Sequence, residues 1–272
     1  MVKRLIVNAD DFGLSTGTSQ GICLGYLNGI ITSTTAMMNY PTAIDDLKKA
    51  AKDCPRLGLG VHLVLTSGKP LSQVDRIPTL VDSNGNFFNH PTFQENIKRI
   101  NINEVEIEWR EQIRAFRAAV NKKPDHLDSH HHVSYASPAL FDLLTKLANE
   151  LGCPVRLPVG TNGTIFSDGN QEWMEKLRYG YANSFVDSFY DHNATQNQLK
   201  KVMHIIADDT FNDTFELMCH PAIVDDGLRH TSAYNERRAD ELAFLCSPET
   251  KNLVKELGIK LIKFPDLKPK KQ

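Results

Sequence analysis

The sequence predicts an α/β protein with a mostly parallel sheet that closes into a barrel. Short β-branched or apolar runs alternate with stretches of helical length along most of the chain. This alternation is typical of parallel strands joined by crossover helices, and 272 residues suit a barrel better than a single open sheet. No repeat period or low-complexity tract divides the chain, so residues 1–272 are interpreted as one domain.

Hydrophobic periodicity and capping signals place the individual elements. Residues 104–120 have the clearest helical spacing, and Ser137-Pro138 predicts the start of a helix that Gly152 ends. Residues 66–103 are rich in Gly, Pro, Asn and Ser, which predicts a long excursion from the barrel. The predicted strands cover residues 5–7, 30–38, 57–65, 126–128, 155–157, 214–219 and 259–264. The predicted helices cover residues 18–28, 42–52, 92–100, 104–120, 138–150, 171–179, 195–207, 235–245 and 248–256.

Bulk composition argues against several classes of function. The 31 basic and 33 acidic residues nearly balance, so neither nucleic acid nor a membrane is expected as a partner. No apolar run approaches the roughly 20 residues that cross a bilayer, and the polar residues from Asn8 onward interrupt any signal-peptide core. The five cysteines are scattered without a CxxC pair, which is typical of reduced thiols in a cytoplasmic protein and argues against zinc held by cysteine.

Four polar clusters lie where predicted strands end. In a barrel of parallel strands the carboxyl ends open onto one face, where chemistry takes place. Side chains separated by some two hundred residues of sequence are therefore expected to meet in one pocket. The clusters are Asp10-Asp11, His62, His130-His131-His132 and His220.

The adjacent acids Asp10 and Asp11 have two interpretations. One acid could cap the following helix while the other is solvated. Alternatively, one carboxylate binds a cation and its neighbour abstracts a proton, because the chain turns at a strand end and both side chains can reach a pocket.

The histidines are a stronger signal together than singly. A lone His62 among apolar residues is more often a hydrogen-bonded core residue than a ligand. Three consecutive imidazoles at residues 130–132, after His126 and Asp128, are unusual within a chain. Because successive side chains alternate in direction, one or two of the three are expected to bind the same ion, with the others in support. A carboxylate with two histidines is a common divalent-cation site that leaves positions open for water and substrate.

His220 and Arg156 complete the candidate residues. Pro221 fixes the backbone after His220. This histidine has two equally supported interpretations, as a structural residue or as a proton donor to a leaving amine. Arg156, at another predicted strand end, either orients a carboxylate such as Asp10 or forms an ordinary salt bridge.

Five segments, in order from residue 5 to about residue 240, together match one known pattern. They are Leu5-Ile6-Val7-Asn8-Ala9-Asp10-Asp11-Phe12-Gly13-Leu14-Ser15, Thr32-Ser33-Thr34-Thr35-Ala36-Met37, Gly60-Val61-His62 with Leu65-Thr66, His126-Leu127-Asp128-Ser129-His130-His131-His132-Val133, and Met218-Cys219-His220-Pro221. The chain resembles the YdjC-like carbohydrate deacetylases, a group that includes the chitooligosaccharide deacetylases. The resemblance covers nearly the whole chain, and its opening block and its Asp-Ser-His-His-His block are highly specific.

The resemblance implies an irregular (β/α) barrel of the NodB deacetylase type with a divalent ion, usually Mg²⁺, at the strand ends; Zn²⁺ and Mn²⁺ are alternatives. It implies metal ligands at Asp11, His62 and His130, the general base at Asp10 and the acid at His220. Supporting roles are expected for three further residues: Arg156, Asp128 and His131. A homodimer is expected from relatives.

The resemblance thus implies a metal-dependent, cytoplasmic hydrolase that removes acetyl groups from N-acetylated mono- or oligosaccharides, such as short chitooligosaccharides in chitin degradation. Two alternatives remain open. One is a glycosidase that uses paired carboxylates and needs no metal, and the other is a sugar- or metal-binding regulator on the same fold.

Overall fold

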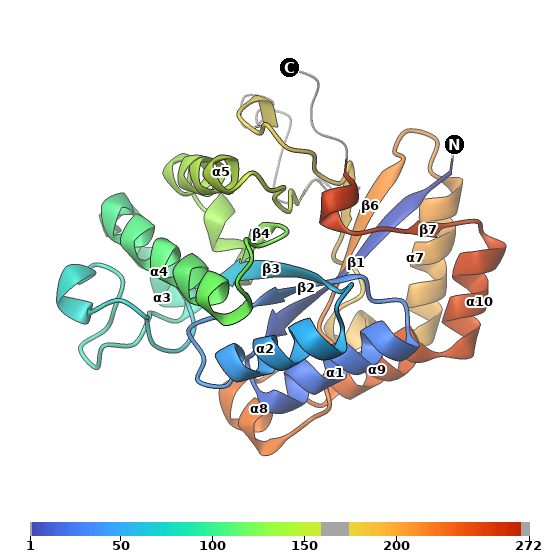
Figure 1. Cartoon of the computed structure of the whole chain (residues 1–272), viewed down its shortest axis with the longest axis horizontal. Helices are drawn as coiled ribbons and strands as arrows, with labels where there is room; N and C mark the ends of the chain where they lie inside the picture. The colour runs from blue at the N-terminus through green and yellow to red at the C-terminus, as the bar shows by residue number, and fades with distance from the viewer. Residues whose placement is uncertain (1, 159–173, 268–272) are drawn as a thin grey trace.

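The computed structural model describes residues 2–158 and 174–267, and one parallel sheet lies at its centre (Figure 1). The strand order is β4-β3-β2-β1-β6-β5, and a short β7 also pairs with β1. Every ladder between these strands is parallel. The strands are β1 (Arg4–Phe12), β2 (Ser33–Ala36), β3 (Gly58–Leu63), β4 (Leu127–Ser129), β5 (Ser184–Val186), β6 (Thr214–Cys219) and β7 (Lys260–Leu261).

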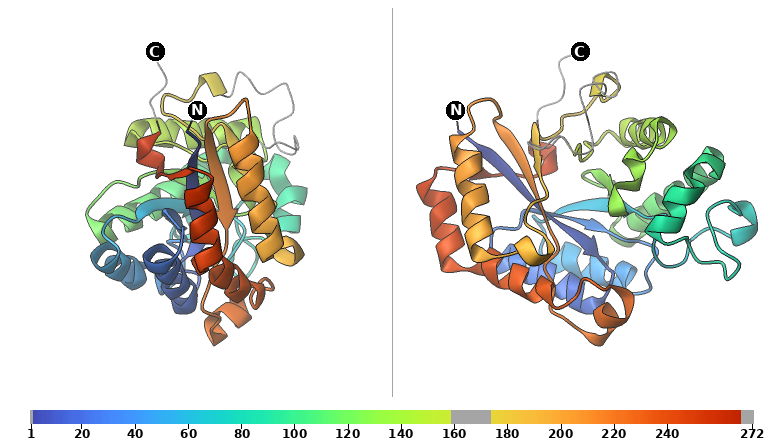
Figure 2. Two further views of the ribbon diagram at one scale, coloured as in Figure 1. Left: turned by 90° about the vertical axis from the view of Figure 1, so that its right-hand side faces the viewer. Right: turned by 180° about the vertical axis from the view of Figure 1, so that it is seen from behind.

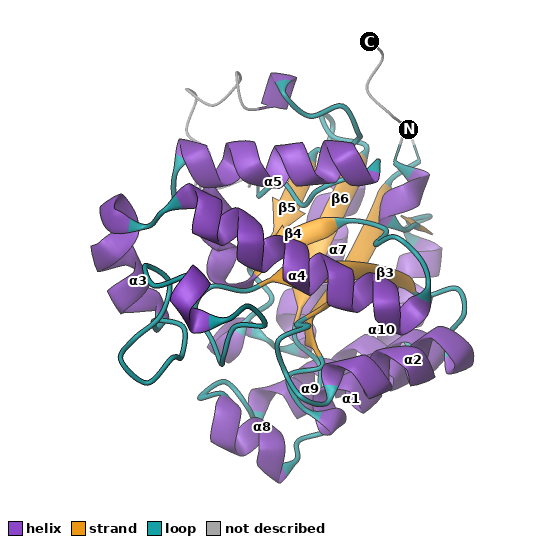
Figure 3. Ribbon diagram, turned by 60° about the vertical axis from the view of Figure 1, so that its left-hand side comes forward, coloured by secondary structure: helices purple, strands orange, loops and turns teal. Residues whose placement is uncertain are grey.

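The sheet curls, and an arc of helices follows its outer surface (Figures 1 and 2). Neighbouring helices touch in the order α5, α4, α2, α1, α9, α10, α7, and Figure 3 shows α4 and α5 side by side at one end of the arc. They are α1 (Thr16–Asn28), α2 (Ala43–Asp53), α4 (Ile102–Val120), α5 (Pro138–Leu151), α7 (Gln196–Asp208), α9 (Arg237–Cys246) and α10 (Pro248–Glu256), with α3 (His90–Asn96) and α8 (Asp226–Thr231) outside the arc.

The predicted barrel is confirmed in an irregular, half-open form. β4 and β5 stand at the two ends of the strand order, and within residues 2–158 and 174–267 no ladder joins them. The central strand β1 is buried on both faces, which explains its continuous run of β-branched and apolar residues. Because β1 pairs in parallel with β2 and β6, its carboxyl end lies between the carboxyl ends of these two strands.

Most predicted elements are present within a few residues of their expected bounds. The expected cap is also present: Ser137 accepts a hydrogen bond from the Leu140 N–H at 3.3 Å, and Gly152 ends the helix in the left-handed region. β6 and α10 have the predicted bounds.

Several predictions differ from the structure. Residues 155–157 do not form a strand; only Val155 bridges Leu127, because Pro154 and Pro158 flank the segment and lack the N–H that a ladder needs. The start of the helix predicted over 171–179 lies outside the described residues; residues 174–175 are helical and 177–179 are not. β5 and α8 were not predicted, because a three-residue strand and a six-residue helix each span less than two repeats of their own period.

No helix in the described ranges combines the length and the apolar character needed to cross a bilayer.

Helix α1 packs unusually close to the segment that follows β6. A Cβ atom on Gly21 would lie 2.6 Å from backbone atoms of Ala222, and the Ile223 N–H donates to the Gly17 carbonyl at 3.0 Å. The two glycines therefore let the helix backbone fix the chain just after His220.

Replacing Gly21 by Ala is expected to lower the free energy of unfolding by about 1–3 kcal/mol, because the clash outweighs the higher helix propensity of Ala. Urea unfolding followed by circular dichroism measures this change. The matched control is Gln20→Ala, at an exposed position of the same helix. Equal stability of the two variants would contradict the close packing.

Candidate functional site

The carboxyl ends of the central strands open into a cavity of about 620 Å³. A second cavity of about 670 Å³ lies on the outer surface, lined by residues of α4 and α5, so volume alone does not locate the site. The first cavity is distinguished by its side chains, which include all the clusters predicted from the sequence. Its lining is Asp10, Asp11, Leu14, His62, Ser67, His90, Ser129, His130, His131, His132, Asp187, Tyr190, Met218, His220, Thr231, Ser232, Ala233, Tyr234 and Arg238.

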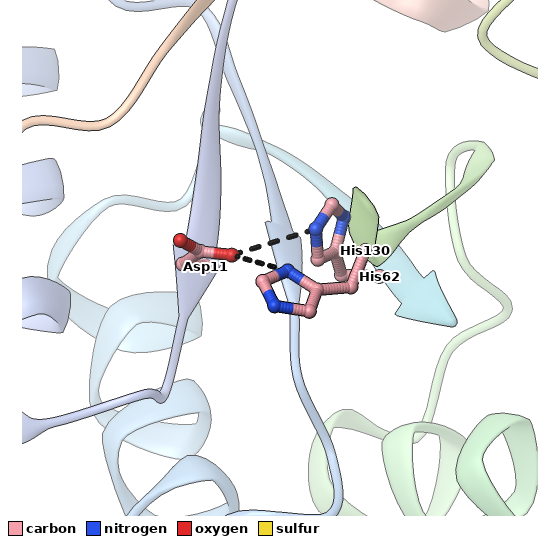
Figure 4. Close-up of side chains that lie close together, drawn as sticks. All are labelled: Asp11, His62 and His130. Atoms are coloured by element: carbon pink, nitrogen blue, oxygen red, sulfur yellow. Dashed lines mark ion pairs between the residues drawn. The ribbon is translucent and has the colours of Figure 1, made fainter. Parts of the chain in front are cut away.

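Asp11, His62 and His130 point toward one another in this cavity (Figure 4). The Asp11 Oδ1 atom lies 3.5 Å from His62 Nε2 and 3.1 Å from His130 Nδ1. One candidate ligand atom from each residue lies within 4.8 Å of the other two. The three residues come from β1, from β3 and from the turn after β4, so the parallel sheet brings them together as its topology predicts.

Both acids at the end of β1 reach the cavity because the strand is irregular there. The register between β1 and β2 shifts between Ala9 and Phe12, and Asp11 has a φ of 66°. This left-handed conformation breaks the alternation of side chains, so Asp10 and Asp11 need not point to opposite faces. Both side chains are buried, with at most 2% of either residue exposed.

Asp128 holds His62 from behind. The Asp128 Oδ1 atom lies 2.6 Å from His62 Nδ1, and Thr35 Oγ1 donates to Asp128 Oδ2 at 3.0 Å. This contact turns His62 Nε2 toward Asp11, the arrangement that commonly orients a metal-binding imidazole. Burial favours a neutral ring, but the carboxylates of Asp128, Asp10 and Asp11 raise the pKa of His62 to about 9. The potential at the site therefore favours positive charge.

Arg156 is fully buried and binds three carboxylates. Its Nη1 and Nη2 atoms donate to Asp10 Oδ2 and Oδ1, both at 2.6 Å, and its Nε donates to Glu216 Oε1 at 2.6 Å. Nη1 also lies 3.0 Å from Asp128 Oδ2. Burial alone would raise the pKa of Asp10, but the Arg156 guanidinium holds that pKa well below its usual range. Of the two interpretations of Arg156, the structure shows the contact with Asp10, within a buried ionic network.

Arg238 is a site residue that the sequence did not reveal. Its Nη2 donates to Asp11 Oδ2 at 2.7 Å, and its Nε donates to the Tyr234 carbonyl at 2.7 Å. It lies on α9 rather than at a strand end, so its place in the sequence carries no signal. Arg238 occupies one oxygen of Asp11 and leaves Oδ1 facing the two histidines.

The three consecutive histidines form a tight turn rather than an extended strand. His131 and His132 have φ values of 53° and 54°, so the strict alternation of side chains in an extended strand is absent here. Only His130 faces Asp11. His131 Nδ1 lies 3.0 Å from Thr66 Oγ1, and its ring packs 3.9 Å from that of His130. His132 packs edge-on against Phe185.

Ser134 follows this turn and lies in the protein interior. It is fully buried, and its hydroxyl lies 2.7 Å from that of Ser129. The hydroxyl of Ser129 also accepts the Ser134 N–H at 3.0 Å, so this pair closes the turn.

His220 lies at the end of β6, on the other side of the cavity. Its backbone N–H donates to Glu241 Oε2 at 2.6 Å, while its ring Nδ1 has no hydrogen-bond partner among the described residues. Burial lowers the pKa of His220 to about 4, so the ring is neutral at pH 7. The ring also contacts Tyr190 and Tyr234.

The donor set around Asp11 fits a divalent cation. Asp11 Oδ1 is buried and accepts no hydrogen bond within the described ranges, and its approach to His130 lacks hydrogen-bond geometry. Leaving such an oxygen unpaired is costly, and a cation shared with His62 and His130 would satisfy it. One carboxylate and two imidazoles form a mixed oxygen and nitrogen donor set of the kind that binds divalent cations, and they leave positions open for water and substrate.

Fold and site together define an α/β half-barrel protein with a candidate metal centre at the carboxyl ends of its strands. The sequence model of the YdjC-like protein family matches residues 4–256, and the chain belongs to this family.

Named relatives and solved structures agree with this membership. A carbohydrate deacetylase of Clostridium beijerinckii is 36% identical over 97% of this chain and all of its own length, and a chitooligosaccharide deacetylase of Yersinia pestis is 35% identical over 98% of this chain and all of its own length. A crystal structure from Enterococcus faecalis, of a protein whose proposed activity is cellobiose-phosphate cleavage, has a TM-score of 0.87 and 32% identity, covering 97% of this chain and 98% of that one.

A family 4 carbohydrate esterase from Streptomyces lividans, solved with acetate, shares the fold. Its TM-score is 0.51 at 10% identity, covering 98% of this chain and 95% of that one. The predicted deacetylase-like barrel is thus confirmed as a fold.

Replacing Arg156 by Met is expected to lower the free energy of unfolding by about 3–5 kcal/mol, because it leaves Asp10, Asp128 and Glu216 buried without their counter-charge. Urea titration at pH 7 tests this. The control is Arg110→Met, which removes a half-exposed arginine paired with Glu106 and Glu150 and is expected to cost less than about 1 kcal/mol. Similar losses in both variants would contradict the importance of the buried network.

Proposed function

We propose that this carbohydrate deacetylase of the YdjC-like family uses one divalent cation to hydrolyse the acetamide group of N-acetylated sugars, releasing acetate and leaving a free amine. The observation that carries the proposal is the convergence of Asp11 Oδ1, His62 Nε2 and His130 Nδ1 in a cavity at the strand ends. The names of the relatives support the substrate class. The proposed substrates are acetylated mono- or oligosaccharides such as short chitooligosaccharides, and the proposed setting is chitin degradation in the cytoplasm by a homodimer.

Asp11, His62 and His130 are the proposed ligands, and Mg²⁺ is the proposed ion. When bound, the ion would polarise the acetyl carbonyl and lower the pKa of a water molecule. Asp128 and Arg238 would keep the ligand atoms in place, because each binds the far side of one ligand.

Asp10 and His220 are the proposed proton carriers. Asp10 would accept the proton of the attacking water, and the proton would end on the departing amine, since hydrolysis of an amide consumes one water. Because Arg156 keeps the pKa of Asp10 low, Asp10 would hold the proton only briefly. His220 is neutral and its Nδ1 is unpartnered within the described ranges, so it can receive a proton and donate it to the amine.

Removing the metal should abolish activity. Wild-type protein treated with a chelator is expected to release no acetate from N-acetylglucosamine or its short β-1,4-linked oligomers, and added Mg²⁺ should restore release. The assay follows acetate and reducing sugar together, with and without chelator. Full turnover in chelator, or new reducing ends without acetate, would favour a paired-carboxylate glycosidase instead.

Substitutions should separate the ligands from the proton carriers. His62→Ala is expected to lose both metal binding and acetate release, because it removes a proposed ligand. Asp10→Asn and His220→Asn should lower kcat by about 10²–10⁴ while metal affinity changes far less. Calorimetric titration with the metal and acetate release measure the two properties. Retained turnover in His62→Ala would refute its assignment as a ligand.

A further inference from the structure

We propose that Tyr190 and Asp187 form the binding site for the sugar ring that carries the N-acetyl group. The inference rests on the proposed function and adds residues that select its substrate. Both residues follow β5, a strand that the sequence did not predict, and both line the cavity at the strand ends.

Tyr190 offers an aromatic face to this cavity. Tyr190 is 41% exposed, and of the exposed large apolar or aromatic residues in the described ranges it is the one that lines the cavity. Exposed aromatic surface in a concave site is typical of ligand binding. The C–H groups on the face of a pyranose ring can pack against such a ring.

The backbone presents Tyr190 in a fixed position. Phe189, the preceding residue, is fully buried, and the Asp191 N–H that follows donates to Tyr234 Oη at 3.1 Å. The Tyr190 carbonyl also accepts the Asn193 N–H at 3.0 Å. Because the backbone is held and the ring packs against Tyr234 and His220, the side chain loses little conformational entropy when a ligand binds.

The position of Tyr190 identifies which sugar ring it would contact. Its ring centroid lies 5.1 Å from that of His220, the proposed donor to the leaving amine, and 4.5 Å from that of Tyr234. The amine is attached to the ring that bears the acetyl group. A substrate whose amine lies beside His220 therefore brings that ring alongside Tyr190.

Asp187 supplies the polar half of the site. It is the first residue after β5, is exposed, and lines the same cavity as Tyr190. An ionised carboxylate accepts hydrogen bonds, and sugar hydroxyls at the edge of the ring can donate them. An aromatic face beside a carboxylate matches a ring with apolar faces and hydroxylated edges.

Kinetics with the β-1,4-linked disaccharide of N-acetylglucosamine test the aromatic contact. Tyr190→Ala is expected to raise KM about tenfold with a much smaller change in kcat, because an aromatic contact contributes binding energy on that scale. Tyr190→Phe keeps the ring and should recover most of the loss. The matched control is Phe211→Ala, an aromatic residue that is 93% exposed in the loop before β6 and outside the cavity; its KM should equal that of wild type.

The same assay tests the carboxylate. Asp187→Asn is expected to raise KM several-fold, because the amide keeps the shape but loses the charge that strengthens hydrogen bonds. An unchanged KM in both Tyr190→Ala and Asp187→Asn would overturn the proposal. A fall in kcat alone in Tyr190→Ala would also overturn it, since this would show that Tyr190 acts only by packing against His220.

Calorimetric binding of the disaccharide separates this proposal from the proposed function. If the wild type binds the sugar but releases no acetate, the proposed reaction fails, while weaker binding to Tyr190→Ala still supports the sugar site. Equal binding by the wild type and Tyr190→Ala, or no binding by the wild type, overturns the sugar site.

Discussion

The buried guanidinium of Arg156 is the interaction on which the site depends. It joins Asp10 on β1, Asp128 on β4 and Glu216 on β6, strands that are spread across the curled sheet. A planar group with five N–H donors can bind several carboxylates at fixed angles, which a lysine cannot. Because Asp128 in turn orients His62, Arg156 also helps to position this candidate metal ligand.

The charges around Arg156 also explain why this region favours the binding of a cation. Arg156 contacts the carboxylates of Asp10, Asp128 and Glu216. Arg238 contacts the carboxylate of Asp11, so four carboxylates share two positive charges. Burial raises the pKa of Glu216 to about 7, so this group is partly protonated at neutral pH, and the remaining carboxylates still outnumber the two arginines. The raised pKa of His62 has the same cause, because the surrounding carboxylates stabilise the positive charge of a protonated imidazole.

How much the sequence predicts depends on where a residue lies. The acids and histidines lie at or just after the carboxyl ends of strands, and parallel strands end at one face, so their grouping could be inferred without coordinates. Arg238 lies within a helix and Glu216 within a strand, and each acquires its role only through packing against residues more than fifty positions away. β5 was missed because three residues show no period. Its strand conformation depends on pairing with β6, which the local sequence does not reveal.

The three consecutive histidines do not have the extended backbone from which their directions were predicted. Alternating directions in an extended chain were expected to leave one or two of them facing the ion. Instead His131 and His132 have left-handed backbone conformations, and His130 lies 3.1 Å from Asp11 Oδ1. Such conformations cost about 1–3 kcal/mol each in non-glycine residues and persist where contacts enforce them. Here the Ser129–Ser134 pair closes the turn and Thr66 holds His131, so the strain is balanced by contacts that fix His130 toward Asp11.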